Sequence, residues 1–177
     1  MASRSRGREF AVQMIYQHKF SGNALEKDME LFWGSAKADA GTRDFTEFLV
    51  RGVVDHATEM DMEISAYLKG WTLERIVLID RIILQIAIFE LTQTTETPWR
   101  VVVDEAVVLG RMFNTDKSGT FINGVLHAWT TKNRAGESKT APPAEADSAG
   151  TGEDDSEPPV ADGVEDDTTP ADTAEED

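Results

Sequence analysis

Apolar side chains recur every three or four residues through almost all of residues 1–134, and strict alternation of apolar and polar residues is nowhere sustained. This spacing places apolar side chains on one face of an α-helix, whereas a half-buried strand needs a period of two. Even the valine-rich segment at residues 101–113, where propensity alone favours a strand, keeps the helical spacing. The pattern therefore predicts an all-α domain.

Turn-forming and capping residues divide this segment into expected helices. A Ser-Gly-Asn sequence at residues 21–23 favours a turn after the first helix. Thr42 and Thr97 are expected to cap two later helices, with Pro98 at the first helical position of the second. Gly124, inside the last helix, is expected to mark a close contact between helices. The expected helices cover residues 5–20, 25–38, 42–69, 75–91, 98–113 and 120–132.

The segment at residues 75–91 is the most hydrophobic of the chain. Its polar side chains, Asp80, Arg81, Gln85 and Glu90, leave only a narrow polar strip. A helix that is apolar nearly all round is usually buried on several sides. We therefore expect this helix to lie at the centre of the fold.

Charge and aromatic content separate the chain into two parts. The whole chain has 177 residues and a net charge of −16, but residues 135–177 contain 15 acids, one base and no aromatic residue. That composition cannot bury enough apolar surface to offset the entropy of ordering. Residues 1–134 contain 18 acids, 16 bases and all the aromatic residues. We expect one helical domain over residues 1–134 and a disordered acidic tail over residues 135–177.

Composition also excludes several classes of protein. The chain has no cysteine, so it has no disulfide, thiol nucleophile or thiolate zinc site, and it suits a reducing, cytoplasmic location. The longest apolar runs are far shorter than the ~18 to 20 residues that a membrane-spanning helix requires. The sequence predicts no association with a membrane.

No pattern of catalytic or metal-binding residues is present. His18, His56 and His127 are scattered, without the spacing of a zinc-binding helix. Residues 116–120 resemble a phosphate-binding loop only in a Lys-Ser pair, because the required glycines are missing. The sequence lacks the Gly-x-Ser-x-Gly nucleophile motif. We expect no catalytic residues, no cofactor and no metal.

One positive signal lies at the N-terminus, where Arg4, Arg6 and Arg8 alternate with small residues. Guanidinium groups pair with phosphate through two hydrogen bonds and stack on bases. Tyr16 and Lys19, on the same expected helix, add a stacking ring and a further cation. The alternative is that these arginines are ordinary solvated charges.

The order of five motifs resembles the NusB family of bacterial transcription antitermination factors. The match covers about residues 4–132 and leaves the acidic tail outside the family pattern. The motifs are RGREFAVQMIY at 6–16, WTLER at 71–75, DRIILQIAIFEL at 80–91, PWRVVVDEA at 98–106 and FINGVL at 121–126.

This resemblance implies a compact all-helical fold of two small packed bundles and a function without catalysis. Family members bind the boxA element of nascent RNA, especially in ribosomal RNA leaders, together with NusE, a ribosomal protein of the small subunit. The complex helps to load NusA and NusG onto RNA polymerase. A homodimer is also possible for this chain.

The resemblance also implies roles for particular residues. The family's arginine cluster and first-helix aromatic fall on Arg4, Arg6, Arg8 and Tyr16, to which we add Lys19 as an RNA contact. Phe113 and Phe121 are candidates for base stacking, with core packing as the alternative. The acid that faces NusE falls on Asp80, beside Arg81, and an intramolecular ion pair or helix cap is the alternative there. A further family acid falls on Lys117, a reversal of charge that should alter how partner or RNA is held.

Two other functions fit the same motifs. One is the RNA-binding module that precedes the catalytic domain of certain RNA cytosine methyltransferases, although this chain has neither a Rossmann-like glycine motif nor a cysteine. The other is a protein-interaction scaffold without RNA binding. Titration with labelled boxA RNA, with and without NusE, distinguishes the scaffold from the antitermination factor.

Overall fold

The computed structural model describes residues 2–94 and 96–134, and within them it contains helices and no strand. The predicted all-α class is confirmed. The prediction of a disordered tail concerns residues outside this range. The elements are α1 (Ala2–Ser21), α2 (Leu25–Ser35), α3 (Ala40–Asp55), α4 (Ala57–Ser65), the short 3-10 helix η1 (Leu73–Arg75), α5 (Leu78–Gln93), α6 (Trp99–Phe113) and α7 (Asp116–Asn133).

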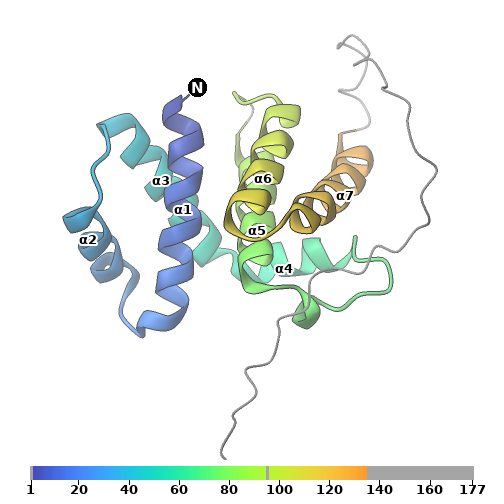
Figure 1. The fold of residues 1–177 in the computed structure, drawn as a ribbon, viewed down its shortest axis with the longest axis horizontal. Helices are drawn as coiled ribbons and strands as arrows, with labels where there is room; N and C mark the ends of the chain where they lie inside the picture. Colours follow the sequence, from blue (N-terminus) through green and yellow to red (C-terminus); the bar gives the residue numbers. More distant parts are fainter. Residues whose placement is uncertain (1, 95, 135–177) are drawn as a thin grey trace, which may run out of the picture.

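Helix α5 lies at the centre of the molecule, as its composition predicted. It packs against α1 and α3 on one side and against α4, α6 and α7 on the other (Figure 1). The first three helices form one small bundle and the last four form a second, so the implied two-bundle arrangement is confirmed. Because α5 belongs to the second bundle and also packs against α1 and α3, it joins the two bundles into one body.

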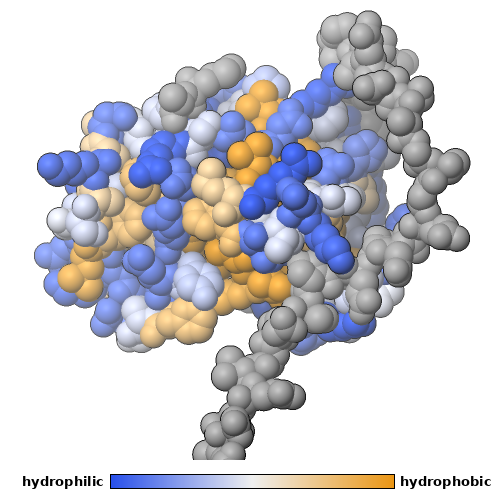
Figure 2. Space-filling model, in the orientation of Figure 1, coloured by the Kyte–Doolittle hydropathy of each residue, from blue (hydrophilic) through white to orange (hydrophobic). Residues whose placement is uncertain are grey.

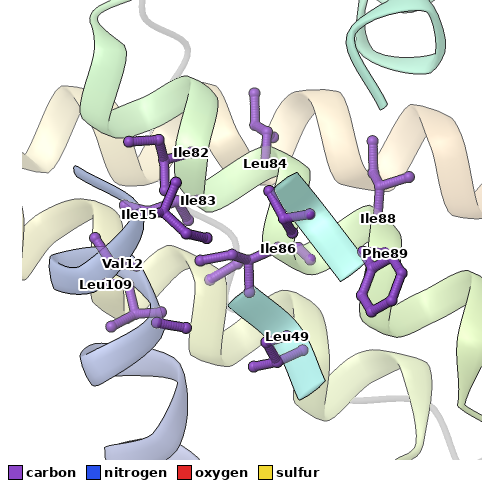
Figure 3. Packing of buried hydrophobic residues seen from close by; sticks show 14 of the residues in the cluster. Val12, Ile15, Leu49, Ile82, Ile83, Leu84, Ile86, Ile88, Phe89 and Leu109 are labelled. Atoms are coloured by element: carbon purple, nitrogen blue, oxygen red, sulfur yellow. The ribbon is translucent and has the colours of Figure 1, made fainter. Parts of the chain in front are cut away.

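The core is built around the buried face of α5. Every residue from Ile82 to Leu91 is buried. Figure 3 shows Val12 and Ile15 of α1 and Leu49 of α3 pointing toward this helix. Fully burying an aliphatic side chain of this size contributes about 1.5–3 kcal/mol, so these contacts dominate the stability of the domain.

Two expected capping residues were wrong by one to three positions. Thr42 does not cap α3, because Asp39 accepts a hydrogen bond from the Thr42 backbone N–H at 2.9 Å and is the N-cap. Helix α6 starts after Pro98, so Thr97 lies one residue outside the cap position. In both places a residue close to the expected one takes the capping position.

Other boundaries also differ from the prediction by three or four residues: α1 starts at Ala2, α2 ends at Ser35, α4 ends at Ser65 and α5 starts at Leu78. The long helix expected over residues 42–69 is interrupted at His56, which separates α3 from α4. The loop expected over residues 114–119 is shorter, because Thr115 caps α7 by accepting a hydrogen bond from the Ser118 backbone N–H.

The close contacts between helices occur at glycines other than Gly124. A Cβ on Gly124 would meet no atom within 4 Å, so the predicted role of this residue was wrong. A Cβ on Gly110 would lie 2.6 Å from Ile122 and 3.3 Å from the Gly119 nitrogen, and one on Gly52 would lie 1.8 Å from the Phe89 ring. Gly110 therefore lets α6 approach α7, and Gly52 lets the Phe89 ring pack against α3.

Replacing Gly52 with alanine is expected to lower the free energy of unfolding by about 1–3 kcal/mol, because the added methyl group overpacks the core against the Phe89 ring. Alanine at Gly124 is the matched control. It should raise the free energy of unfolding by roughly 0.5–1 kcal/mol, because the site is open and alanine is the better helix former. Urea denaturation of both variants measures the difference. Equal stabilities would contradict the packing of Phe89 against Gly52.

Candidate functional site

The N-terminal end of α1 presents two partly exposed guanidinium groups. Arg4 donates to Glu96 at 2.7 Å and to the Thr97 hydroxyl at 2.6 Å, and its side chain is 40% exposed. Arg6 donates to Glu9 at 2.6 Å and is 54% exposed. We call Arg4 and Arg6 the arginine end of α1. Exposed ion pairs of this kind are weak, so both guanidinium groups can exchange a carboxylate for another anion.

Aromatic rings support both guanidinium groups. The Arg4 guanidinium carbon lies 5.3 Å from the centroid of the Phe45 ring, and that of Arg6 lies 4.4 Å from the Phe10 ring. A guanidinium stacked on a ring still directs its N–H donors outward in its own plane. The two guanidinium groups are therefore pre-oriented to bind an anion such as a phosphate.

Arg8, the third arginine of the predicted cluster, is buried at 3% exposure. Its Nε and one terminal nitrogen donate to the two carboxylate oxygens of Glu90 at 2.7 and 2.6 Å, and Glu105 lies 3.4 Å away. This corrects the expectation that Arg8 lies on an open nucleic-acid surface. The sequence did contain a signal, because Glu90 stands in the most apolar helix and a buried carboxylate needs a cation.

A groove lies at the other end of α1 and is about 820 Å³ in volume. Tyr16 and Phe20 form part of one wall, 42% and 68% exposed, with their ring centroids 5.2 Å apart. Figure 2 shows hydrophobic surface in the middle of the face that is in view and at the lower end of α1. Exposed aromatic rings beside an apolar groove are typical of a site for another protein. The rest of the lining comprises Gln13, Gln17, residues 74–79, Phe113 and Asn114.

Tyr16 therefore belongs to the groove and lies away from the arginine end. It stands twelve residues beyond Arg4, about 18 Å along a helix axis. Lys19 lies further along α1 and is exposed. The structure thus divides the predicted RNA contacts on this helix between its two ends.

Asp80, predicted to face a partner protein, is 1% exposed. Both of its carboxylate oxygens accept from the Asn114 side chain at 3.4 Å, and burial raises the pKa of the Asp80 carboxyl above its usual value despite hydrogen bonds from Ser118 and Asn114. This corrects the expectation of a direct partner contact. Asp80 instead fixes the start of α5 to the turn between α6 and α7, where Asn114 lines the groove.

Arg81 and Lys117, also predicted to face a partner, lie in different surroundings. Arg81 pairs with Asp61, donating from Nε at 2.9 Å and from a terminal nitrogen, which matches the intramolecular alternative for this residue. Lys117 is exposed in the first turn of α7, where it makes no ion pair with residues 2–94 or 96–134. Lys117 is therefore accessible to a binding partner.

Phe113 and Phe121 are partly buried and pack against the core. Phe113 also lines the groove, so its ring borders both core and surface. Both rings pack against the core, as the alternative for these two residues predicted. Part of each side chain remains exposed to solvent.

A polar cluster that the sequence did not suggest holds the turn from α1 to α2. Asp28 accepts from Ser21 at 2.5 Å and Asn23 at 2.9 Å, and His18 Nδ1 lies 2.5 Å away. These hydrogen bonds lower the pKa of the Asp28 carboxyl to about 2, with the Ser21 hydroxyl as the largest cause. The cluster fixes the end of α1, where Phe20 borders the groove. A short turn rich in Ser, Asn and Asp was the available signal.

Among residues 2–94 and 96–134, no helix has the length and apolar character needed to cross a bilayer. The same residues contain no group of three or more His, Asp or Glu side chains placed to hold a metal ion.

The sequence also matches a known protein family. The sequence model of the NusB family matches residues 5–131. The transcription antitermination protein NusB of Anaeromyxobacter dehalogenans is 38% identical over 124 residues, which cover 70% of this chain and 87% of the relative.

Two solved structures have a similar fold. NusB of T. maritima superposes with a TM-score of 0.66 at 29% identity, covering 73% of this chain and 91% of that one. A crystal structure of antitermination factors NusB and NusE in complex with double-stranded RNA contains a chain with a TM-score of 0.66 at 23% identity, covering 75% of this chain and 98% of that one.

Proposed function

The chain belongs to the NusB family, and we propose that it is an antitermination factor that binds boxA RNA of nascent ribosomal transcripts together with NusE. The observation that carries the proposal is the arrangement of α1. One end of this helix holds two exposed, ring-supported guanidinium groups, and the other end forms the wall of an apolar groove. One helix thus supplies a surface for phosphate and a surface for a protein.

The arginine end of α1 suits the backbone of single-stranded RNA. Arg4 and Arg6 would exchange Glu96 and Glu9 for phosphate oxygens, and binding would release counterions from the RNA. Phe121 and Lys117, on the first turns of α7 beside the groove, are our further candidates for base and phosphate contact. Arg8 is not a candidate because it is buried. Lys19 remains a candidate at the opposite end of α1.

The groove suits NusE as the protein partner. Tyr16, Phe20 and Phe113 provide apolar surface, and Glu74 and Arg75 provide charge at the rim. The solved complex that contains a chain of similar fold is described as NusB with NusE and double-stranded RNA, which supports this choice of partner. In this proposal Asp80 acts indirectly, by holding Asn114 at the edge of the groove.

The wider assembly follows from the family. We propose that the complex with NusE and RNA joins NusA, NusG and RNA polymerase in the cytoplasm, and that the chain has no catalytic role. A homodimer formed through the groove would compete with NusE for the same aromatic side chains.

Titration of fluorescently labelled boxA RNA tests the proposal directly. The affinity should rise when purified NusE is present, and an RNA of equal length and scrambled sequence should bind more weakly. The scaffold alternative has one observation in its favour, because Arg4 and Arg6 are already paired with carboxylates. NusE binding without any RNA binding, at all protein concentrations and at low salt, would favour the scaffold.

Residues 1–134 form the RNA-binding domain in this proposal, and residues 135–177, with a charge of −14, act as a tethered competitor for RNA. Arg134 donates to the Leu91 carbonyl at the end of α5, a few residues before Glu96, the partner of Arg4. Arg134, the last described residue, therefore contacts the same end of α5 that leads into Glu96.

Truncation after Arg134 should leave the free energy of unfolding within about 0.5 kcal/mol. It should also tighten RNA binding about two- to fivefold at ~0.05 M salt, and less at higher salt as screening increases. A tail of unchanged length with amides in place of its acids is the matched control and should behave like the truncation. Equal RNA affinities for all three proteins would contradict competition by the tail.

A further inference from the structure

The arginine end of α1 is continued by an arginine on another helix. Arg43, in the first turn of α3, has its guanidinium carbon 5.2 Å from the Trp33 ring. The Trp33 ring meets the Phe10 ring edge to face, with centroids 5.6 Å apart, and the Phe10 ring supports Arg6 at 4.4 Å. Two packed aromatic rings therefore carry one arginine each, Arg6 from α1 and Arg43 from α3.

Arg43 resembles Arg6 in exposure and in pairing. Its side chain is 52% exposed, and Nε donates to Glu47 at 2.9 Å. The other N–H groups of its guanidinium make no hydrogen bond to residues 2–94 or 96–134. A pair between residues four apart on an exposed helix face is weak, so a phosphate can replace Glu47. Stacking on Trp33 restricts the guanidinium before any ligand binds, which lowers the entropy cost of binding.

We propose that Arg43 is a further RNA-contacting residue that binds a backbone phosphate next to the one bound by Arg6, so that the RNA surface extends from α1 onto α3. The ring contacts bring the Arg6 and Arg43 guanidinium groups close to one another, and α3 packs beside α1 (Figure 1). This inference rests on the proposed function, because it assumes that the arginine end of α1 binds RNA.

Arg51 provides a matched control on the same helix. It lies eight residues after Arg43, about 12 Å along the helix axis. Its side chain is 46% exposed and it pairs with Glu26 at 2.9 Å. No aromatic ring supports Arg51 among the described residues. Alanine at either position removes one exposed positive charge and leaves one carboxylate behind, so any difference between the variants comes from the location of Arg43 or from its stacking on Trp33.

The test measures the affinity of fluorescein-labelled single-stranded boxA RNA at several salt concentrations, with NusE at saturation. Arg43→Ala should weaken binding about three- to tenfold and reduce the salt slope by about 0.7, the value for one phosphate contact on a single strand. Arg51→Ala should match the wild type. Arg43→Lys keeps the charge without the planar stack, so it should keep the salt slope and recover only part of the affinity.

The outcomes separate this inference from the proposed function. One outcome is that Arg43→Ala and Arg51→Ala bind RNA with equal affinity while the double variant Arg4→Ala with Arg6→Ala binds weakly. In that case the extension onto α3 is wrong, and the arginine end of α1 remains the RNA site. If none of these variants weakens binding, or if the wild type binds no RNA, the RNA site itself is wrong. Full recovery by Arg43→Lys would overturn the role of stacking on Trp33. Melting curves should show that all variants are folded, because the altered side chains are exposed.

Discussion

Replacing Arg8 with alanine is expected to lower the free energy of unfolding by about 3–5 kcal/mol, the usual cost of removing one partner of a buried ion pair. Glu90 is fully buried, and its two oxygens accept from Arg8 at 2.7 and 2.6 Å. Without Arg8 the carboxylate would remain in the core with no cation. The free energy of unfolding of a domain of this kind is typically only about 5–15 kcal/mol. The variant should therefore unfold at a lower temperature and at a lower urea concentration than the wild type.

Urea denaturation of four proteins tests this expectation. Arg6→Ala, on the same helix, removes an exposed pair and should cost less than about 1 kcal/mol. Replacing Arg8 and Glu90 together with methionine and leucine should recover most of the loss, because no unpaired charge is then buried. A loss below about 1 kcal/mol for Arg8→Ala would mean that the pair with Glu90 does not form in solution.

Replacing Arg4 and Arg6 together with alanine is expected to weaken boxA RNA binding by at least about tenfold and to reduce the salt slope by about 1.4, as for the loss of two phosphate contacts on single-stranded RNA. The two guanidinium groups are 40% and 54% exposed, and each rests on an aromatic ring. The free energy of unfolding should change little, because exposed ion pairs contribute about 0–1 kcal/mol.

Substitutions of the paired acids provide the opposite test. Glu9→Gln and Glu96→Gln leave the arginines in place and remove the carboxylates that compete with phosphate, so both should tighten RNA binding. The comparison uses the same labelled RNA over a range of salt concentrations. An unchanged salt slope in the double arginine variant would show that RNA binds elsewhere on the molecule.

The order of five motifs indicated the family, whereas periodicity and composition alone predicted the helical class and the central position of α5. These properties depend on which residues are apolar and how they are spaced, and both can be counted along the chain. Capping residues and the break at His56 were harder to predict, because several nearby polar residues compete for each cap and packing decides among them.

The three N-terminal arginines were equivalent in the sequence, and only the tertiary structure separated them. Successive helical residues are turned by roughly 100°, so Arg4 and Arg8 point to similar sides of α1 and Arg6 points away. Arg8 lies where α5 and α6 cover the helix and meets Glu90, whereas Arg4 lies one turn nearer the end and remains partly exposed. The sequence determined that three cations stand at the start of a helix. The position of the neighbouring helices decided which arginine forms a structural ion pair. That position is set by contacts between residues more than eighty positions apart.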